Sequence, residues 1–156
     1  MTRPPRPSSE FWPAPGARPS VRTRAVAFLE ATREVEIAAL ETAIADGGGE
    51  VLQRADGIVI AAFGSASACL RVCASLPDGV RVGSSCGDVL YEDGLVYGLP
   101  VIEASRLMDF AAPGQIVCAQ RLVGVGDLPI ESFRSLGELE MRGFEARLPA
   151  CELLRR

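Results

Sequence analysis

The segment GGGEVLQRADGIVIAAF, residues 47–63, predicts two strands joined by a tight turn. Glu50–Gln53 and Ile58–Phe63 are both of strand length, and the Asp56-Gly57 pair between them is a common two-residue hairpin turn. The three glycines at its start, Gly47–Gly49, end any helix that precedes the hairpin. The segment therefore predicts an antiparallel hairpin that the chain enters from a helix.

Further helical and strand patterns lie on both sides of this hairpin. Glu34–Asp46 places apolar residues at i, i+3 and i+7 and predicts a helix, whereas Arg24–Glu30 is too short for periodicity to separate a strand from a helix start. After the hairpin, Ser65 or Ser67 can cap a second helix that runs to about Ser75. Further strands are expected at Val80–Ser84 and Asp88–Tyr91 (separated by Gly87), Gln115–Ala119, Phe133–Met141 and Ala150–Leu154, and a third helix at Val101–Phe110. This order predicts an α+β fold, with a largely antiparallel sheet and helices on one face.

The first 20 residues differ in composition from the rest of the chain. Residues 1–20 are dense in proline, which disfavours helices and sheet ladders alike. We therefore expect a disordered or extended arm over residues 1–20 and one domain over residues 21–156. The arm carries Phe11 and Trp12, the only tryptophan of the chain, and this aromatic pair is expected to pack on a partner or on the domain itself.

Length and charge limit the possible partners. The chain has 156 residues, of which 48% are hydrophobic and 23% charged, as is typical of one globular domain. Its net charge of -4 disfavours nucleic acid as a partner. No apolar run is long enough for a membrane span, and the N-terminus lacks a signal-peptide pattern, so a soluble cytoplasmic protein is expected.

The residue types that are missing limit the chemistry. All 16 basic residues are arginine, and the chain contains no lysine, histidine or asparagine. This excludes a Ser-His-Asp or Cys-His pair, imidazole metal ligands, a Schiff base and a P-loop lysine. The cysteines are odd in number and scattered, so we expect small buried residues rather than disulfides or a zinc site; they are Cys69, Cys73, Cys86, Cys118 and Cys151.

From Gly47 to Leu154 the chain resembles the catalytic domain of class III nucleotidyl (adenylate/guanylate) cyclases. The motifs that carry the resemblance follow one another in the family's order and spacing, although each is weak alone. They are Gly47–Val51, Ala55–Gly57 with Phe63, Val80–Gly83, Cys86–Val89, Val96–Gly98, Ala104–Leu107, Ala112–Ile116 and Leu136–Phe144. The resemblance implies a ferredoxin-like βαββαβ core with extra strands, which agrees with the predicted element order.

The resemblance also implies a site for metal ions. In this family two aspartates hold two metal ions while the 3′-hydroxyl of a nucleoside triphosphate attacks its own α-phosphate. Asp56 matches the second aspartate, although hairpin geometry alone also favours Asp-Gly here. Glu30 stands in the place of the first, and its alternative is an ordinary carboxylate at a strand end. Magnesium or manganese is thus the expected cofactor if a nucleotide binds, and no other cofactor is implied.

Other family roles fall on residues that a partner protomer supplies. Arg106 matches the arginine that stabilises the transition-state phosphate, with a surface pair to Glu103 or Asp109 as the alternative. The ribose-orienting asparagine is replaced by Ile102, which offers no hydrogen bond. The two purine-reading positions have become Leu52 and Leu95.

Arg54 is the one candidate that could replace a lost purine-reading group. Because most of these polar groups are gone, the resemblance favours a degenerate, non-catalytic cyclase homology domain that acts as a dimerisation or regulatory module in signalling. The alternatives are an atypical but active adenylate/guanylate cyclase and a small-ligand sensor that uses the altered purine pocket. The expected partners are a second copy or another cyclase-like domain, with a nucleoside triphosphate as a possible ligand.

Overall fold

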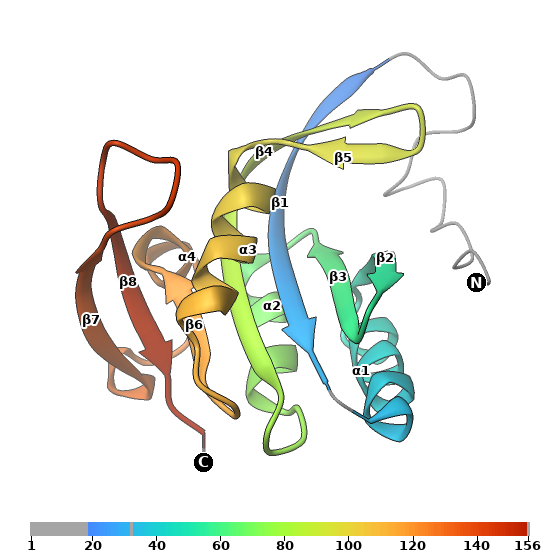
Figure 1. Ribbon diagram of the computed structural model, residues 1–156, viewed down its shortest axis with the longest axis horizontal. Helices are drawn as coiled ribbons and strands as arrows, with labels where there is room; N and C mark the ends of the chain where they lie inside the picture. Colours follow the sequence, from blue (N-terminus) through green and yellow to red (C-terminus); the bar gives the residue numbers. More distant parts are fainter. Residues whose placement is uncertain (1–18, 32, 156) are drawn as a thin grey trace.

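The computed structural model describes residues 19–31 and 33–155 (Figure 1). Phe11, Trp12 and the rest of residues 1–18 lie outside the described residues. The strands are β1 Ser20–Glu30, β2 Glu50–Ala55, β3 Ile58–Phe63, β4 Arg81–Glu92, β5 Leu95–Tyr97, β6 Ile116–Ala119, β7 Phe133–Leu139 and β8 Leu148–Leu153. The helices are α1 Glu34–Asp46, α2 Ala66–Ala74, α3 Leu99–Phe110 and α4 Gln120–Val125, with a single 3-10 turn at Ile130–Ser132.

The strands form one sheet in the order β2-β3-β1-β4-β6-β8-β7, and β5 pairs with β4. All neighbouring strands are antiparallel except β4 and β6. The unit β1-α1-β2-β3-α2-β4 contributes the order β2-β3-β1-β4, which is the ferredoxin-like arrangement. The structure therefore confirms the predicted α+β class, and it resolves Arg24–Glu30 as part of a strand.

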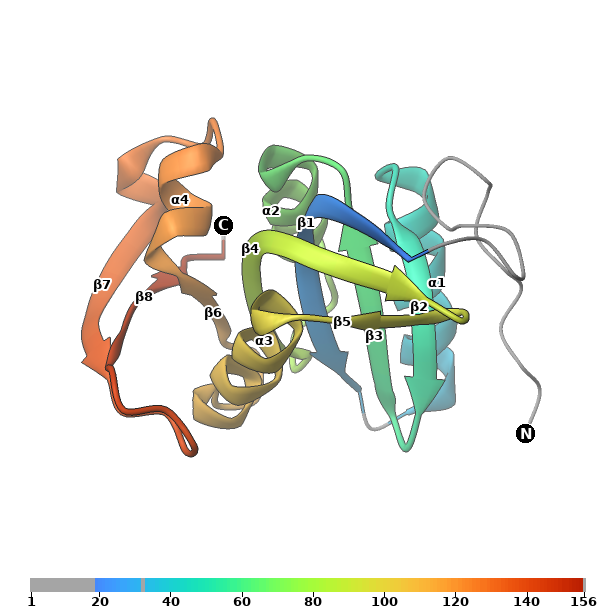
Figure 2. The ribbon, with the colours of Figure 1, turned by 90° about the horizontal axis from the view of Figure 1, so that it is seen from above.

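The helices cover both faces of the sheet, whereas the sequence predicted one face. On the first face Leu29 of β1 packs in one core with Leu40 of α1 and Leu70 of α2. On the second face Val26 of β1 packs with Ala104 of α3. Figure 2 shows α2 and α3 on opposite sides of the sheet. The one-face prediction holds for the two helices of the ferredoxin-like unit and fails for α3, because β1 alternates apolar side chains toward both faces.

Three local features differ from the sequence prediction. Gly87 does not break the strand: with φ of 150° it stays in register with Arg24, and β1 pairs with β4 along its whole length. The short strand β5 and the helix α4 were not predicted. Each is only three to six residues long, too short for a periodic pattern to emerge.

Gly83 sets the position of α3. A Cβ atom built on Gly83 of β4 would lie 2.1 Å from the backbone nitrogen of Met108 and 2.2 Å from the carbonyl oxygen of Ala104. The backbone of α3 therefore rests directly on the backbone of β4. This contact fixes α3, which carries Ile102 and Arg106, against the centre of the sheet.

Candidate functional site

Glu30 and Asp56, the two expected metal carboxylates, belong to neighbouring segments at one end of the sheet. The Ala31 amide donates a hydrogen bond of 3.0 Å to the Gly57 carbonyl, so the β2–β3 turn lies beside the end of β1. Asp56 and Gly57 both have positive φ, 52° and 79°, as a type I′ hairpin turn requires. Turn geometry is thus sufficient to account for an Asp-Gly pair here.

Glu30 already has a partner within the chain. Arg81, its neighbour on β4, donates to Oε1 of Glu30 from Nη2 at 2.9 Å and from Nε at 3.1 Å. Within residues 19–31 and 33–155, no cluster of three or more acidic, cysteine or histidine side chains is suited to a metal ion. Two carboxylates, one of them held by a guanidinium, do not complete a magnesium or manganese site by themselves, because such ions take about six oxygen ligands. The phosphates of a bound nucleotide would have to supply others.

Ile102 and Arg106 lie one turn apart on α3. Ile102 is 46% exposed, and Nε of Arg106 donates to the Arg142 carbonyl at 3.3 Å in the β7–β8 connection. Within the described chain Arg106 forms no ion pair with Glu103 or Asp109, so that sequence prediction is wrong. Arg106 is instead held by a loop carbonyl at the edge of the domain.

Glu103 is buried at 5% exposure and pairs with Arg121 of α4. Arg121 also donates to the Cys86 carbonyl at 2.7 Å and to Oγ of Ser85 at 2.9 Å, and Ser85 donates to Glu103 at 2.9 Å. This network was not predicted from the sequence. A signal was available, because a helix over Val101–Phe110 places Glu103 beside the apolar Ala104 and Leu107, and a buried acid needs a cation.

Leu52 and Leu95, the two purine-reading positions of the resemblance, line one pocket of about 220 Å³. Ile60 and Val101 line it as well, so its wall is largely apolar. Arg54 is not part of it: Nη1 of Arg54 is 3.1 Å from Oε1 of Glu41 on α1, across the sheet from α3. The structure thus brings the two leucines together and engages Arg54 elsewhere.

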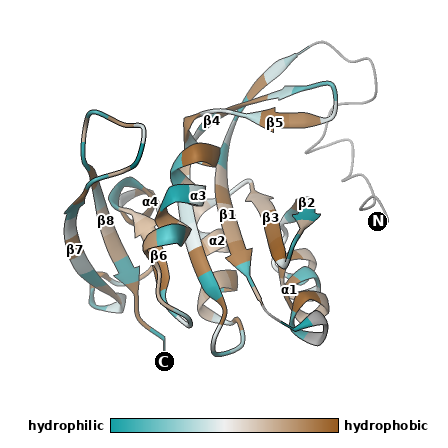
Figure 3. Ribbon diagram, viewed as in Figure 1, coloured by the Kyte–Doolittle hydropathy of each residue, from teal (hydrophilic) through white to brown (hydrophobic). Residues whose placement is uncertain are grey.

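Exposed apolar side chains continue outward from this pocket along β5 and the start of α3. Leu95, Tyr97, Leu99 and Ile102 are 46–53% exposed, and we call them the β5–α3 ridge. Figure 3 shows hydrophobic residues on β5 and on the first turn of α3. Single exposed apolar residues are ordinary, but four within eight residues form a patch of the kind found at interaction sites.

The cysteines form no site of their own. All five are free and buried. A hydrogen bond to Cys73 and burial raise the pKa of Cys69, and burial raises the pKa of Cys86, Cys118 and Cys151. Protonated buried thiols are poor nucleophiles and poor metal ligands. This confirms the sequence prediction of small buried residues without disulfides.

Several solved structures described as adenylate or guanylate cyclases share this fold. An adenylate/guanylate cyclase/hydrolase from Silicibacter pomeroyi matches with a TM-score of 0.74 and 22% identity, over 86% of this chain and 98% of that one. The adenylyl cyclase CyaB from P. aeruginosa matches with a TM-score of 0.76 and 14% identity, over 90% of this chain and 97% of that one. The chain therefore has the fold of class III adenylate/guanylate cyclase catalytic domains.

Relatives by sequence match only part of the chain. An uncharacterized protein of Mycobacterium tuberculosis is 42% identical over 74 residues, which is 47% of this chain and 19% of that protein. A Mycobacterium bovis protein gives the same figures. The chain thus spans about a fifth of the length of these curated relatives, and no family model matches it. The helices of the described residues are all too short or too polar to cross a bilayer.

Proposed function

We propose that this chain is a cyclase homology domain that does not form cyclic nucleotides and acts instead as a dimerisation or regulatory module in signalling. The observation that carries the proposal is the apolar pocket in which Leu52 and Leu95 meet. At these positions the cyclase resemblance calls for polar groups that read the purine. Ile102, which is exposed on α3, likewise offers no hydrogen bond to a ribose.

The transition-state stabilisation lost with these contacts is large enough to remove most of the cyclase activity. An oriented polar contact is worth about 2–4 kcal/mol of transition-state stabilisation, and misplacing a reacting group by about 1 Å costs roughly a hundredfold in rate. Three such contacts are missing, at Leu52, Leu95 and Ile102. Their effects are not strictly additive, but together they lower the rate of cyclic-nucleotide formation to a small fraction of that of an intact site.

The partner we propose is a second copy of the chain or another cyclase-like domain, docked on the β5–α3 ridge. Four exposed apolar side chains gain from being covered, at about 25 cal/mol per Å² of apolar surface. Arg106 at the edge of α3 would then face the partner. A bound nucleoside triphosphate, with magnesium or manganese, would meet Asp56 of one copy and Arg106 of the other, the two family positions that keep their side chains.

An assay for cyclic product tests the absence of catalysis. Purified protein is incubated with ATP or GTP and manganese, and cAMP and cGMP are measured beside an Asp56→Asn variant. We expect no product above that of the variant. Product that disappears in Asp56→Asn would establish the atypical active cyclase, which Asp56 and Arg106 favour as the second candidate function.

Sedimentation tests the dimer. Wild-type protein at tens of micromolar is compared with Ile102→Asp, and with Ile130→Asp as a control because Ile130 is 72% exposed outside the ridge. Ile102→Asp should weaken association by at least about tenfold and Ile130→Asp should not. If the wild type is monomeric throughout, the homodimer is wrong, and mixing with an active cyclase domain then tests the heterodimer.

A further inference from the structure

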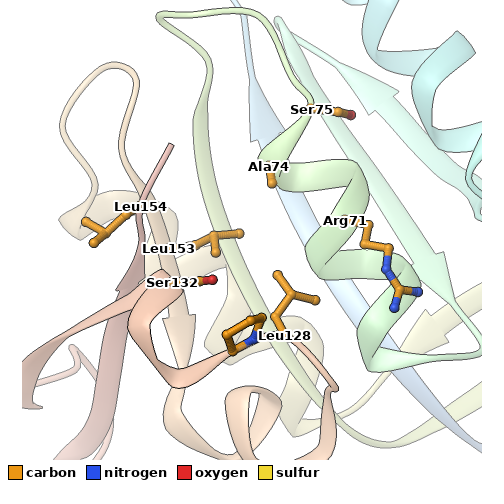
Figure 4. A pocket seen from close by; sticks show the side chains of 8 residues that line it. Arg71, Ala74, Ser75, Leu128, Ser132, Leu153 and Leu154 are labelled. Carbon is orange, nitrogen blue, oxygen red and sulfur yellow. The ribbon is translucent and has the colours of Figure 1, made fainter. Parts of the chain in front are cut away.

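A second cavity, of about 310 Å³, lies between α2 and the C-terminal strands. Ala74 of α2 forms one wall, and Leu128 and Leu153 form the other (Figure 4). Helix α2 belongs to the face of the sheet opposite α3, whereas the pocket of Leu52 and Leu95, which we call the purine-type pocket, adjoins Val101 of α3. The two cavities are therefore separate.

Polar contacts at both ends connect the two walls of this cavity. At one end Arg71 of α2 donates to both carboxylate oxygens of Asp127, at 2.8 and 2.7 Å, and the Asp127 amide donates to Oγ of Ser67 at 2.9 Å. At the other end Arg155 donates to the Leu76 carbonyl, just beyond α2, at 2.6 Å. Within the C-terminal wall, the Leu154 amide donates to the Ser132 carbonyl at 2.8 Å. The space between these contacts is thus a pocket that is open to solvent on one side.

The lining of the cavity indicates the charge of its occupant. Five of the eight lining residues are apolar, and Arg71, the only charged one, is neutralised by Asp127. The Arg71 guanidinium also points away from Leu153 (Figure 4). Ser75 donates its hydroxyl to the Val72 carbonyl at 2.8 Å, which leaves the Ser132 hydroxyl for a ligand. Burying a charged group against such a wall is costly because nothing there pairs with it.

We propose that this cavity binds a neutral, mostly apolar small molecule about the size of two fused rings, with one hydrogen-bonding group that meets Ser132. The size follows from the volume, since an apolar cavity of about 150 Å³ holds one benzene ring. The apolar wall supplies the affinity, and Ser132 supplies orientation. The site is independent of the proposed function, because it shares no lining residue with the purine-type pocket or with the β5–α3 ridge.

A matched pair of probes tests the charge of the ligand. 1-Naphthol has two fused rings, one hydroxyl and no charge at neutral pH, whereas 1-naphthalenesulfonate has the same rings with a negative charge. Calorimetric titration should show one saturable 1-naphthol site per chain, and at least about tenfold weaker binding of the sulfonate. Absent or non-saturable binding of 1-naphthol, or equal binding of the two probes, would overturn the proposal.

A matched pair of variants tests the location. Ala74→Phe places a ring in this cavity from an exposed helix position, and Gln53→Phe does the same in the purine-type pocket. Ala74→Phe should weaken 1-naphthol binding by at least about tenfold, with the circular dichroism of the wild type retained, and Gln53→Phe should leave it unchanged. Weaker 1-naphthol binding in Gln53→Phe alone would place the ligand in the purine-type pocket and would overturn the proposal. Binding of 1-naphthol that weakens as the protein concentration rises would show that a second copy of the chain covers the cavity, and this result would overturn the proposal as well.

Discussion

At the scale of single residues, the pair of Glu103 and Arg121 links α3 to α4 and β4. The Glu103 side chain is 6% exposed, and Arg121 joins it to Ser85 and to the Cys86 carbonyl of β4. The two residues lie 18 positions apart, so a helical pattern identifies the acid as buried but gives no sign of its cation. The same holds for Leu52 and Leu95, whose shared pocket exists only in the folded sheet.

Replacement of Arg121 by methionine should therefore destabilise the domain. The variant keeps most of the side-chain volume but leaves the Glu103 carboxylate buried with only the Ser85 hydroxyl beside it. Because the Arg121 side chain is itself 40% exposed, we expect a loss of about 2–3 kcal/mol in the free energy of unfolding, below the full cost of a buried unpaired charge. Urea denaturation measures it. The double variant Glu103→Met/Arg121→Met should recover part of the loss, and a double variant less stable than Arg121→Met would refute this account.

At the scale of elements, most helices and strands can be predicted from the sequence, because each has a periodic pattern of apolar residues or a residue that caps its end. The helix Glu34–Asp46 was predicted at the bounds it has in the structure, and Ser65 caps α2 by accepting a hydrogen bond from Ala68 at 3.2 Å. Local pattern does not tell which face of the sheet a helix covers. That depends on contacts such as the one at Gly83, between segments some 20 residues apart.

The contact at Gly83 leads to a prediction about a pair of glycines. Gly83→Ala should cost about 3 kcal/mol in the free energy of unfolding, because its methyl group would collide with the α3 backbone and α3 would have to move off β4. Gly124→Ala in α4 meets nothing within 4 Å and should instead stabilise by about 0.5 kcal/mol, since alanine is the better helix former. Thermal unfolding and urea denaturation of the two variants measure the difference. A Gly83→Ala protein as stable as Gly124→Ala would show that the α3 backbone does not rest on Gly83 of β4.

At the scale of the whole molecule, composition and burial together determine the response to alkaline pH. The chain has no lysine, so the usual ammonium titration near pH 10 is absent, and its arginines keep their charge. Cysteine and tyrosine are then the main side chains that titrate above pH 8. Burial raises the pKa of Tyr91 as well as that of the buried thiols.

A folded-state pKa above the unfolded one means that the folded protein holds these protons more tightly. The stability that they contribute is therefore complete below the unfolded thiol pKa of about 8.5, and it is lost progressively as the pH rises above it. Urea denaturation at pH 7, 8.5 and 10 should show a free energy of unfolding that is flat and then falls. Cys118→Val removes one fully buried thiol and should reduce the slope above pH 9 by up to about 1.4 kcal/mol per pH unit, the value for one proton. Equal slopes in the wild type and in Cys118→Val would mean that Cys118 does not stay protonated in the folded state, and that the alkaline response originates elsewhere.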